Sequence, residues 1–206
     1  MKHWIKYSNK KYTPGDEFPI FYRFDQIVRT TSVITYYDNQ TIYTCGHCFA
    51  ENAETPLGKL TYSSGFDTPD EGLELAIIKV NNPESFDNLG YQLYQEPSKP
   101  IGQQVILLHN GEQIKGKVID YIENKSQLSK YNIETHIDKL VFPYYLIRGI
   151  DSKLETKHGY SGSPWIYNGK QILGGHIGKA IVNIESEQIE VSYAKPIIQE
   201  IDRIIY

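Results

Sequence analysis

The sequence predicts an all-β protein, and two observations carry that prediction. Residues that favour strands are abundant, because the chain of 206 residues contains 17 tyrosines, and isoleucine, threonine and valine recur in short runs. Turn signals separate these runs and divide the chain into about ten to twelve short strands. Frequent turns and few helical patterns favour a sandwich or a barrel architecture.

The expected elements follow one another along the chain. Residues 1–20 are expected to form an arm that leads into the first strand. The expected strands then cover residues 27–37, 41–44, 58–63, 73–80, 104–108, 113–122, 140–150, 164–167, 171–177 and 188–194. Residues 196–205 carry apolar side chains at helical spacing and are expected to form one closing helix.

Two Asn-Gly pairs mark tight hairpins. Asn110-Gly111 and Asn168-Gly169 each lie between two β-rich runs, and this dipeptide is a strong hairpin signal. A loop over 83–100, rich in Asn, Gly, Ser and Pro, separates two sets of strands of similar size. We therefore expect an arm over 1–20, a first β domain over 21–95 and a second over 96–206.

Composition limits the partners and the compartment. Apolar content of 40% and charged content of 22% are typical of a soluble globular protein, and a net charge of −4 gives no general attraction to nucleic acid or anionic membranes. No apolar stretch reaches the length of a membrane span or a signal-peptide core. Two cysteines are too few for a disulfide framework. We expect a cytoplasmic protein with no cofactor, no metal, no nucleic-acid partner and no membrane partner.

One serine has the setting of a nucleophile. Ser161 lies between Gly159 and Gly162 in the segment GYSGSP, residues 159–164. Glycine permits a sharp bend that presents a hydroxyl while neighbouring amide hydrogens converge, as a nucleophilic serine and its oxyanion hole require. A Gly/Ser/Pro turn between two strands has the same composition, so this segment alone leaves both interpretations open.

A second cluster, TCGHC at residues 44–48, also allows more than one interpretation. As a Cys-x-x-Cys motif, Cys45 and Cys48 have the form of a thiol–disulfide redox pair, which requires a long helix to follow within a βαβ unit. A zinc site would need a second Cys/His pair at finger-like spacing, and the sequence offers none. The other interpretation makes His47 the base that activates the serine.

An acid that orients the imidazole would complete such a site. Glu74 interrupts the apolar run LELAIIKV at residues 73–80, between the histidine and the serine in sequence. Asp67, Asp70 and Glu71 are competing candidates on the preceding loop.

Order and context of these three segments resemble one family, the chymotrypsin-like serine proteases. TCGHC resembles their Thr-Ala-Ala-His-Cys box, residues 74–78 (ELAII) resemble their Asp-Leu-Ala-Leu/Ile strand, and GYSGSP resembles their Gly-Asp-Ser-Gly-Gly-Pro. The bacterial glutamyl-endopeptidase branch is most similar, through GYSGSP and LGGHIG at residues 173–178. The resemblance covers about residues 27–205.

The resemblance implies a fold and a set of roles. The fold would be two antiparallel six-stranded β-barrels with the site between them and a short C-terminal helix. Ser161 would be the nucleophile, His47 the base and Glu74 the orienting acid of a peptide hydrolase acting through an acyl-enzyme. The backbone N–H groups of Gly159 and Ser161 would form the oxyanion hole.

It also implies a substrate pocket. Thr156 and His176 match positions that receive an acidic side chain in glutamyl endopeptidases, and Gly178 lies on the same wall. Glu155 lies near the position where trypsin-like enzymes carry a carboxylate that binds Lys or Arg. We expect a preference for Glu or Asp before the scissile bond, which Glu155 would oppose if it pointed inward.

Departures from the family pattern leave alternatives open. Tyr160 replaces the aspartate that pairs with a newly cut N-terminus in the animal enzymes, Glu74 replaces an aspartate, and Ile177 replaces a tryptophan. Cys45 is too close in sequence to be the usual disulfide partner of Cys48. A protease acting on protein or peptide substrates, with or without an activating partner, has two alternatives: a latent or inactive binding module on the same fold, and a Cys45/Cys48 oxidoreductase.

Overall fold

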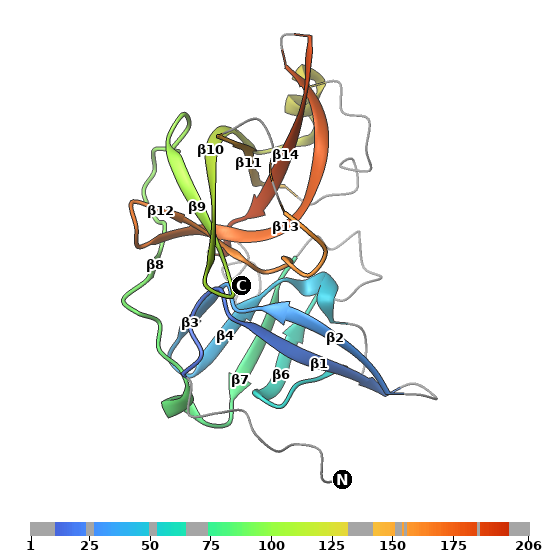
Figure 1. Cartoon of the computed structure of the whole chain (residues 1–206), viewed down its shortest axis with the longest axis vertical. Coiled ribbons are helices and arrows are strands. Elements are labelled where there is room, and N and C mark those ends of the chain that lie inside the picture. The colour runs from blue at the N-terminus through green and yellow to red at the C-terminus, as the bar shows by residue number, and fades with distance from the viewer. Residues whose placement is uncertain are drawn as a thin grey trace.

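The computed structural model describes residues 11–23, 27–49, 53–64, 74–131, 142–150, 154, 156–184 and 186–197. Within these residues the protein is built from strands joined by loops and short 3-10 turns, and Ile197 at the end of the described chain is helical. Strands β1–β7 form the lower part of the molecule as drawn in Figure 1, and strands β9–β14 form the upper part. The expected all-β class is confirmed.

The first half pairs as two antiparallel sheets. One has the order β2-β1-β5 and the other the order β3-β4-β7-β6. The strands are β1 (Glu17–Arg23), β2 (Ile27–Val33), β3 (Tyr36–Asp38), β4 (Thr41–Thr44), β5 (Ala53–Glu54), β6 (Gly58–Ser63) and β7 (Ala76–Val80). Both sheets bury apolar side chains in one shared core, among them Phe18, Ile42 and Ile78. A single core is what lets the two sheets act as one scaffold.

The second half is one sheet that closes on itself. Its order is β12-β9-β10-β11-β14-β13, and β12 pairs with both β9 and β13, which joins the two ends. The strands are β9 (Gln104–His109), β10 (Glu112–Ile122), β11 (Tyr144–Gly149), β12 (Pro164–Tyr167), β13 (Gln171–Ile184) and β14 (Glu187–Lys195). The short β8 (Gln92–Leu93), which we expected in the first domain, pairs in parallel with β13 of this second sheet.

Both Asn-Gly hairpins are confirmed. Asn110 (φ 47°) and Gly111 (φ 84°) connect β9 to β10, and Asn168 (φ 48°) and Gly169 (φ 73°) connect β12 to β13. Two successive positive φ angles give the turn whose twist matches that of the flanking strands.

The expectations for the N-terminal arm and for residues 27–37 were wrong in part. β1 begins at Glu17, and the segment before it is tied down, because Gly15 N–H donates to Ile34 O at 2.8 Å and Asn110 N–H donates to Gly15 O at 2.8 Å. The expected strand over 27–37 is two strands, β2 and β3. It breaks because Val33 N–H turns to Ser161 O while Thr35 N–H turns to Tyr43 O.

Three further expectations differ from the structure or lie partly outside the described residues. The strand expected over 73–80 begins at Ala76, so Glu74 precedes it rather than lying within it. The loop expected over 83–100 holds a 3-10 turn, η2 (Pro83–Ser85), as well as β8, and η3 (Lys125–Lys130) follows β10. Of the expected closing helix, only Pro196 and Ile197 are among the described residues. Within the described chain, no helix has the length and apolar character that crossing a bilayer requires.

Candidate active site

The histidine of the TCGHC segment lies on a one-turn 3-10 helix, η1 (Gly46–Cys48), directly after β4. The turn lies close against the backbone that precedes β7. A Cβ on Gly46 would be 2.8 Å from Leu75 N, so only glycine allows this approach. The close contact with Leu75 places His47 beside Glu74, the residue that precedes Leu75.

The serine segment is fixed to the first half of the molecule. Val33 N–H donates to Ser161 O at 3.2 Å, and Thr35 Oγ1 donates to Gly162 O at 2.6 Å. Gly162 has φ +91°, and a Cβ there would be 2.4 Å from Val33 O. Backbone contact across the two halves therefore requires the glycine that follows Ser161.

These contacts bring the three residues of the expected triad together. His47 Nε2 lies 2.8 Å from Ser161 Oγ, and His47 Nδ1 lies 2.9 Å from Glu74 Oε2. The side chains of His47 and Glu74 are 29% and 24% exposed, so solvent and substrate reach the edge of this chain of hydrogen bonds. The competing acids Asp67, Asp70 and Glu71 lie outside the described residues.

The surroundings of the His47 imidazole shift its pKa. Burial alone lowers the pKa of His47, but the neighbouring Cys48 and Glu74 outweigh it and raise the pKa to about 10. The hydrogen bond from Cys45 lowers the pKa of Cys48 well below its ordinary value, against its burial, and His47 lowers it further. These opposite shifts favour the imidazolium form of His47 and the thiolate form of Cys48, and a protonated imidazole cannot accept a proton.

Two amides beside the serine have the form of an oxyanion hole. Within the described chain, neither Gly159 N–H nor Ser161 N–H donates a hydrogen bond. The amides of Gly162 and Ser163, by contrast, are both used, by His176 O and Tyr160 O. Gly159 has φ +98°, a conformation that other residues rarely adopt. Open donors at this place could receive developing negative charge.

Tyr160 holds the serine segment from the other side. It is buried, its hydroxyl donates to Glu112 Oε2 at 3.0 Å, and its ring contacts His109 edge-on with ring centroids 3.9 Å apart. His109 Nδ1 in turn lies 3.1 Å from Ser163 Oγ. We call Tyr160, His109 and Glu112 the tyrosine brace. The brace joins the β9–β10 hairpin to the serine segment. Tyr160 stands at the position where the pattern of chymotrypsin-like proteases has an aspartate.

Loosening the brace is expected to lower turnover rather than binding. Tyr160→Phe keeps the ring and removes the bond to Glu112, worth roughly 1.5 kcal/mol for a hydrogen bond to a charged group, or about tenfold in kcat. Steady-state kinetics on a peptide substrate measure this, with KM expected to stay near the wild-type value. Tyr160→Phe combined with Glu112→Ala should cost little more than either change, and full additivity would contradict the brace.

The expected specificity residues are placed only in part. Thr156 and His176 are both buried, and Thr156 Oγ1 has no hydrogen-bond partner among the described residues. Gly178 lies on β13, where an added Cβ would meet the Tyr193 hydroxyl at 2.8 Å. Glu155 lies outside the described residues.

His176 is held in one orientation by a serine that sequence reasoning missed. His176 Nδ1 lies 2.7 Å from Ser192 Oγ, which also accepts from Trp165 Nε1 at 3.1 Å. Burial lowers the pKa of His176 to about 3, and the nearby charges of His47, Lys179 and His109 contribute. His176 is therefore neutral at physiological pH. It can act as a neutral hydrogen-bonding group and not as a cation.

The two cysteines do not match a thioredoxin-type site. Cys45 precedes a three-residue 3-10 turn, and the next residue, Phe49, is extended, so no long helix begins here. Together with His47 they place one potential ligand atom each within 4.8 Å of one another. A tetrahedral zinc ion would hold its sulfurs about 3.8 Å apart, whereas these lie 2.8 Å apart and both imidazole nitrogens are already hydrogen-bonded. The geometry does not fit a metal centre.

Comparison with solved structures identifies the fold. The chain superposes on Thermobifida fusca protease A with a TM-score of 0.59 at 12% identity, over 94% of this chain and 96% of the other. Cellulomonas bogoriensis chymotrypsin gives 0.57 at 17% identity, over 84% and 87%. A glutamic-acid-specific serine protease, described as using a histidine triad in substrate binding, gives 0.57 at 13% identity, over 93% and 97%. No family model and no curated protein matches the sequence.

The chain therefore has the fold of the chymotrypsin-like serine proteases. At sequence identities of 12–17%, these superpositions show the fold alone, so the activity has to be argued from the site.

Proposed function

We propose that this protein is a serine endopeptidase that cleaves protein or peptide substrates through an acyl-enzyme. The observation that carries the proposal is the continuous chain of hydrogen bonds from Ser161 Oγ through both nitrogens of His47 to Glu74. A nucleophile, a base and an orienting acid at these distances satisfy the geometric test for a catalytic triad.

In the proposed mechanism Ser161 Oγ attacks the scissile carbonyl while neutral His47 takes its proton at Nε2. Glu74 accepts a hydrogen bond from the Nδ1–H group and stabilises the imidazolium that forms. His47 then returns the proton to the leaving amine. Water, activated in the same way, releases the acid product and restores the serine. The open amides of Gly159 and Ser161 would stabilise the oxyanion in both steps.

We further propose a preference for an acidic residue before the scissile bond. The unpartnered buried hydroxyl of Thr156 supports it, because an orphaned donor is costly unless a ligand satisfies it. The neutral imidazole of His176, held by Ser192, supports it as a second hydrogen-bonding group. The fold neighbour described as glutamic-acid-specific uses histidines in substrate binding, in agreement with this choice.

Hydrolysis of a peptide set that varies only the residue before the scissile bond tests both proposals. We expect Glu and Asp to be cleaved at least tenfold faster than Gln or Ala, in keeping with a site built from polar partners. Thr156→Val, which keeps the shape and removes the hydroxyl, should lower kcat/KM about tenfold for Glu substrates and leave Gln substrates unchanged. Equal loss for both substrates would contradict a role in acid recognition, and no hydrolysis of any peptide by either the reduced or the oxidised protein would contradict the protease.

A further inference from the structure

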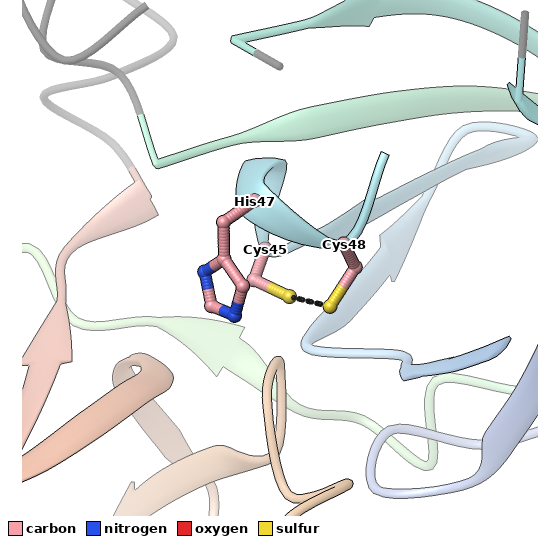
Figure 2. Close-up of side chains that lie close together, drawn as sticks. All are labelled: Cys45, His47 and Cys48. Atoms are coloured by element: carbon pink, nitrogen blue, oxygen red, sulfur yellow. Dashed lines mark hydrogen bonds between the residues drawn. The ribbon is translucent and has the colours of Figure 1, made fainter. Parts of the chain in front are cut away.

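Two free cysteines share a single turn with the proposed base. Cys45 immediately precedes η1 and Cys48 ends it, with His47 between them in sequence, and their Sγ atoms lie 2.8 Å apart. Figure 2 shows the two sulfur atoms facing one another across the turn, with the imidazole projecting from the same turn. The proposed mechanism uses neither thiol, so their placement calls for a separate explanation.

The turn already has the shape that a disulfide requires. The 3-10 residues Gly46 and His47 lie between the two cysteines, and three 3-10 steps span about 6 Å. That separation falls within the range of Cα distances that disulfides span, so the bond can close without a large movement of the backbone. Cys45 is buried, whereas Cys48 is partly exposed. An oxidant can therefore reach Cys48 first.

We propose that Cys45 and Cys48 form a reversible intrachain disulfide, and that its formation releases His47 to act as the base of the triad. Oxidation would then activate the protease and reduction would silence it. This inference rests on the proposed function, whose base it regulates.

The reaction balances with a small-molecule disulfide such as glutathione disulfide as the oxidant. The Cys48 thiolate attacks one sulfur of the oxidant, forms a mixed disulfide and releases one glutathione thiolate. Cys45 then loses its proton to solvent and attacks the Cys48 sulfur, which releases the second glutathione. Two cysteine thiols are oxidised to one disulfide while one glutathione disulfide is reduced to two thiols.

The link to the base is electrostatic. Cys48 and Glu74 both raise the pKa of His47, and Cys45 lies on the same turn. Ser161, which contacts Nε2, is uncharged, and the buried His176, which interacts electrostatically with His47, is neutral. A disulfide carries no charge, so its formation removes the contribution of Cys48 and leaves that of Glu74.

The size of the effect follows from the ionisation equilibrium. With a pKa of about 10, only about 0.3% of the imidazole is neutral near pH 7.5. A return toward the ordinary pKa of histidine would raise the neutral fraction, and with it the reactivity of Ser161, on the order of 100-fold.

The test compares fluorophosphonate labelling of the full chain in reductant and after treatment with glutathione disulfide. We expect oxidised wild type to label on the order of 100-fold faster near pH 7.5. Cys48→Ala removes the thiolate, so it should label at the oxidised rate even in reductant. A second measurement does not depend on catalysis. Iodoacetamide at mildly acidic pH should modify Cys48 and spare Cys45 in the reduced protein, and modify neither after oxidation.

The outcomes separate this inference from the proposed function. If Ser161 labels equally fast in both redox states, or if no intrachain disulfide forms while Ser161 labels, the switch is wrong and the protease stands. If the disulfide forms but Ser161 labels in no state, and Cys48→Ala does not label either, the proposed function is wrong and the switch has nothing to control. Fast labelling confined to oxidised wild type and Cys48→Ala supports both.

Discussion

Ser161→Ala is expected to lower kcat/KM for a cleaved peptide by about 10⁶-fold, the largest effect of any single change in this protein. The alanine removes the atom that attacks the carbonyl and leaves the fold intact, because Ser161 is anchored through its backbone oxygen and Val33. The assay uses protein treated with glutathione disulfide, so that both wild type and variant are compared in the state expected to be active.

The matched control is Ser129→Ala, at an exposed position on η3. It should hydrolyse the peptide at the wild-type rate. His47→Ala should cost about as much as Ser161→Ala, and the double variant little more than either, because the two residues act as one unit. A Ser161→Ala protein that retains a tenth of the wild-type rate would exclude Ser161 as the nucleophile.

Glu74→Gln is expected to lower kcat by about 10⁴-fold, the loss seen when a triad acid becomes an amide. The amide no longer stabilises the imidazolium or enforces the tautomer with its proton on Nδ1. Because Glu74 raises the pKa of His47, its loss should also move the acidic limb of the pH–rate profile, where the rate rises as His47 loses its proton, to lower pH. A pH series of kcat/KM measures both effects.

Two further variants test whether the effect of Glu74→Gln comes from the loss of the Glu74 charge. Glu187→Gln, at an exposed position in β14, should leave the rate and the profile unchanged. Glu74→Asp should retain far more activity than Glu74→Gln because it keeps the charge. A Glu74→Gln protein with an unchanged profile would mean that another acid, such as the sequence candidates Asp67, Asp70 or Glu71, orients the imidazole.

Local patterns predicted the β class and the hairpins because their causes are local. An Asn-Gly pair adopts positive φ angles in almost any context, so Asn110-Gly111 and Asn168-Gly169 could be placed from the sequence. The order of His47, Glu74 and Ser161 could be predicted through a resemblance, although nothing local brings residues 114 positions apart within 2.8 Å. That closeness depends on the glycines at 46 and 162, which let the backbone segments touch.

Other features could not be predicted because they depend on contacts made only in the folded chain. The break at Ile34 follows from hydrogen bonds of the neighbouring amides to two different parts of the protein. The tyrosine brace joins Tyr160 to Glu112, and no pattern in either segment marks the other as its partner. The Cys-x-x-Cys motif was visible as a redox pair, but the placement of both sulfurs beside His47 depends on the short 3-10 turn that follows Cys45.

The most direct test of an assembled nucleophile, base and acid is mass-spectrometric mapping of the fluorophosphonate adduct on oxidised wild-type protein. We expect one adduct per chain, on Ser161, formed at a rate that follows the deprotonation of His47 and is lost in His47→Ala. An adduct on another residue, or equal labelling of wild type and His47→Ala, would contradict the triad, because the serine would then react without its base.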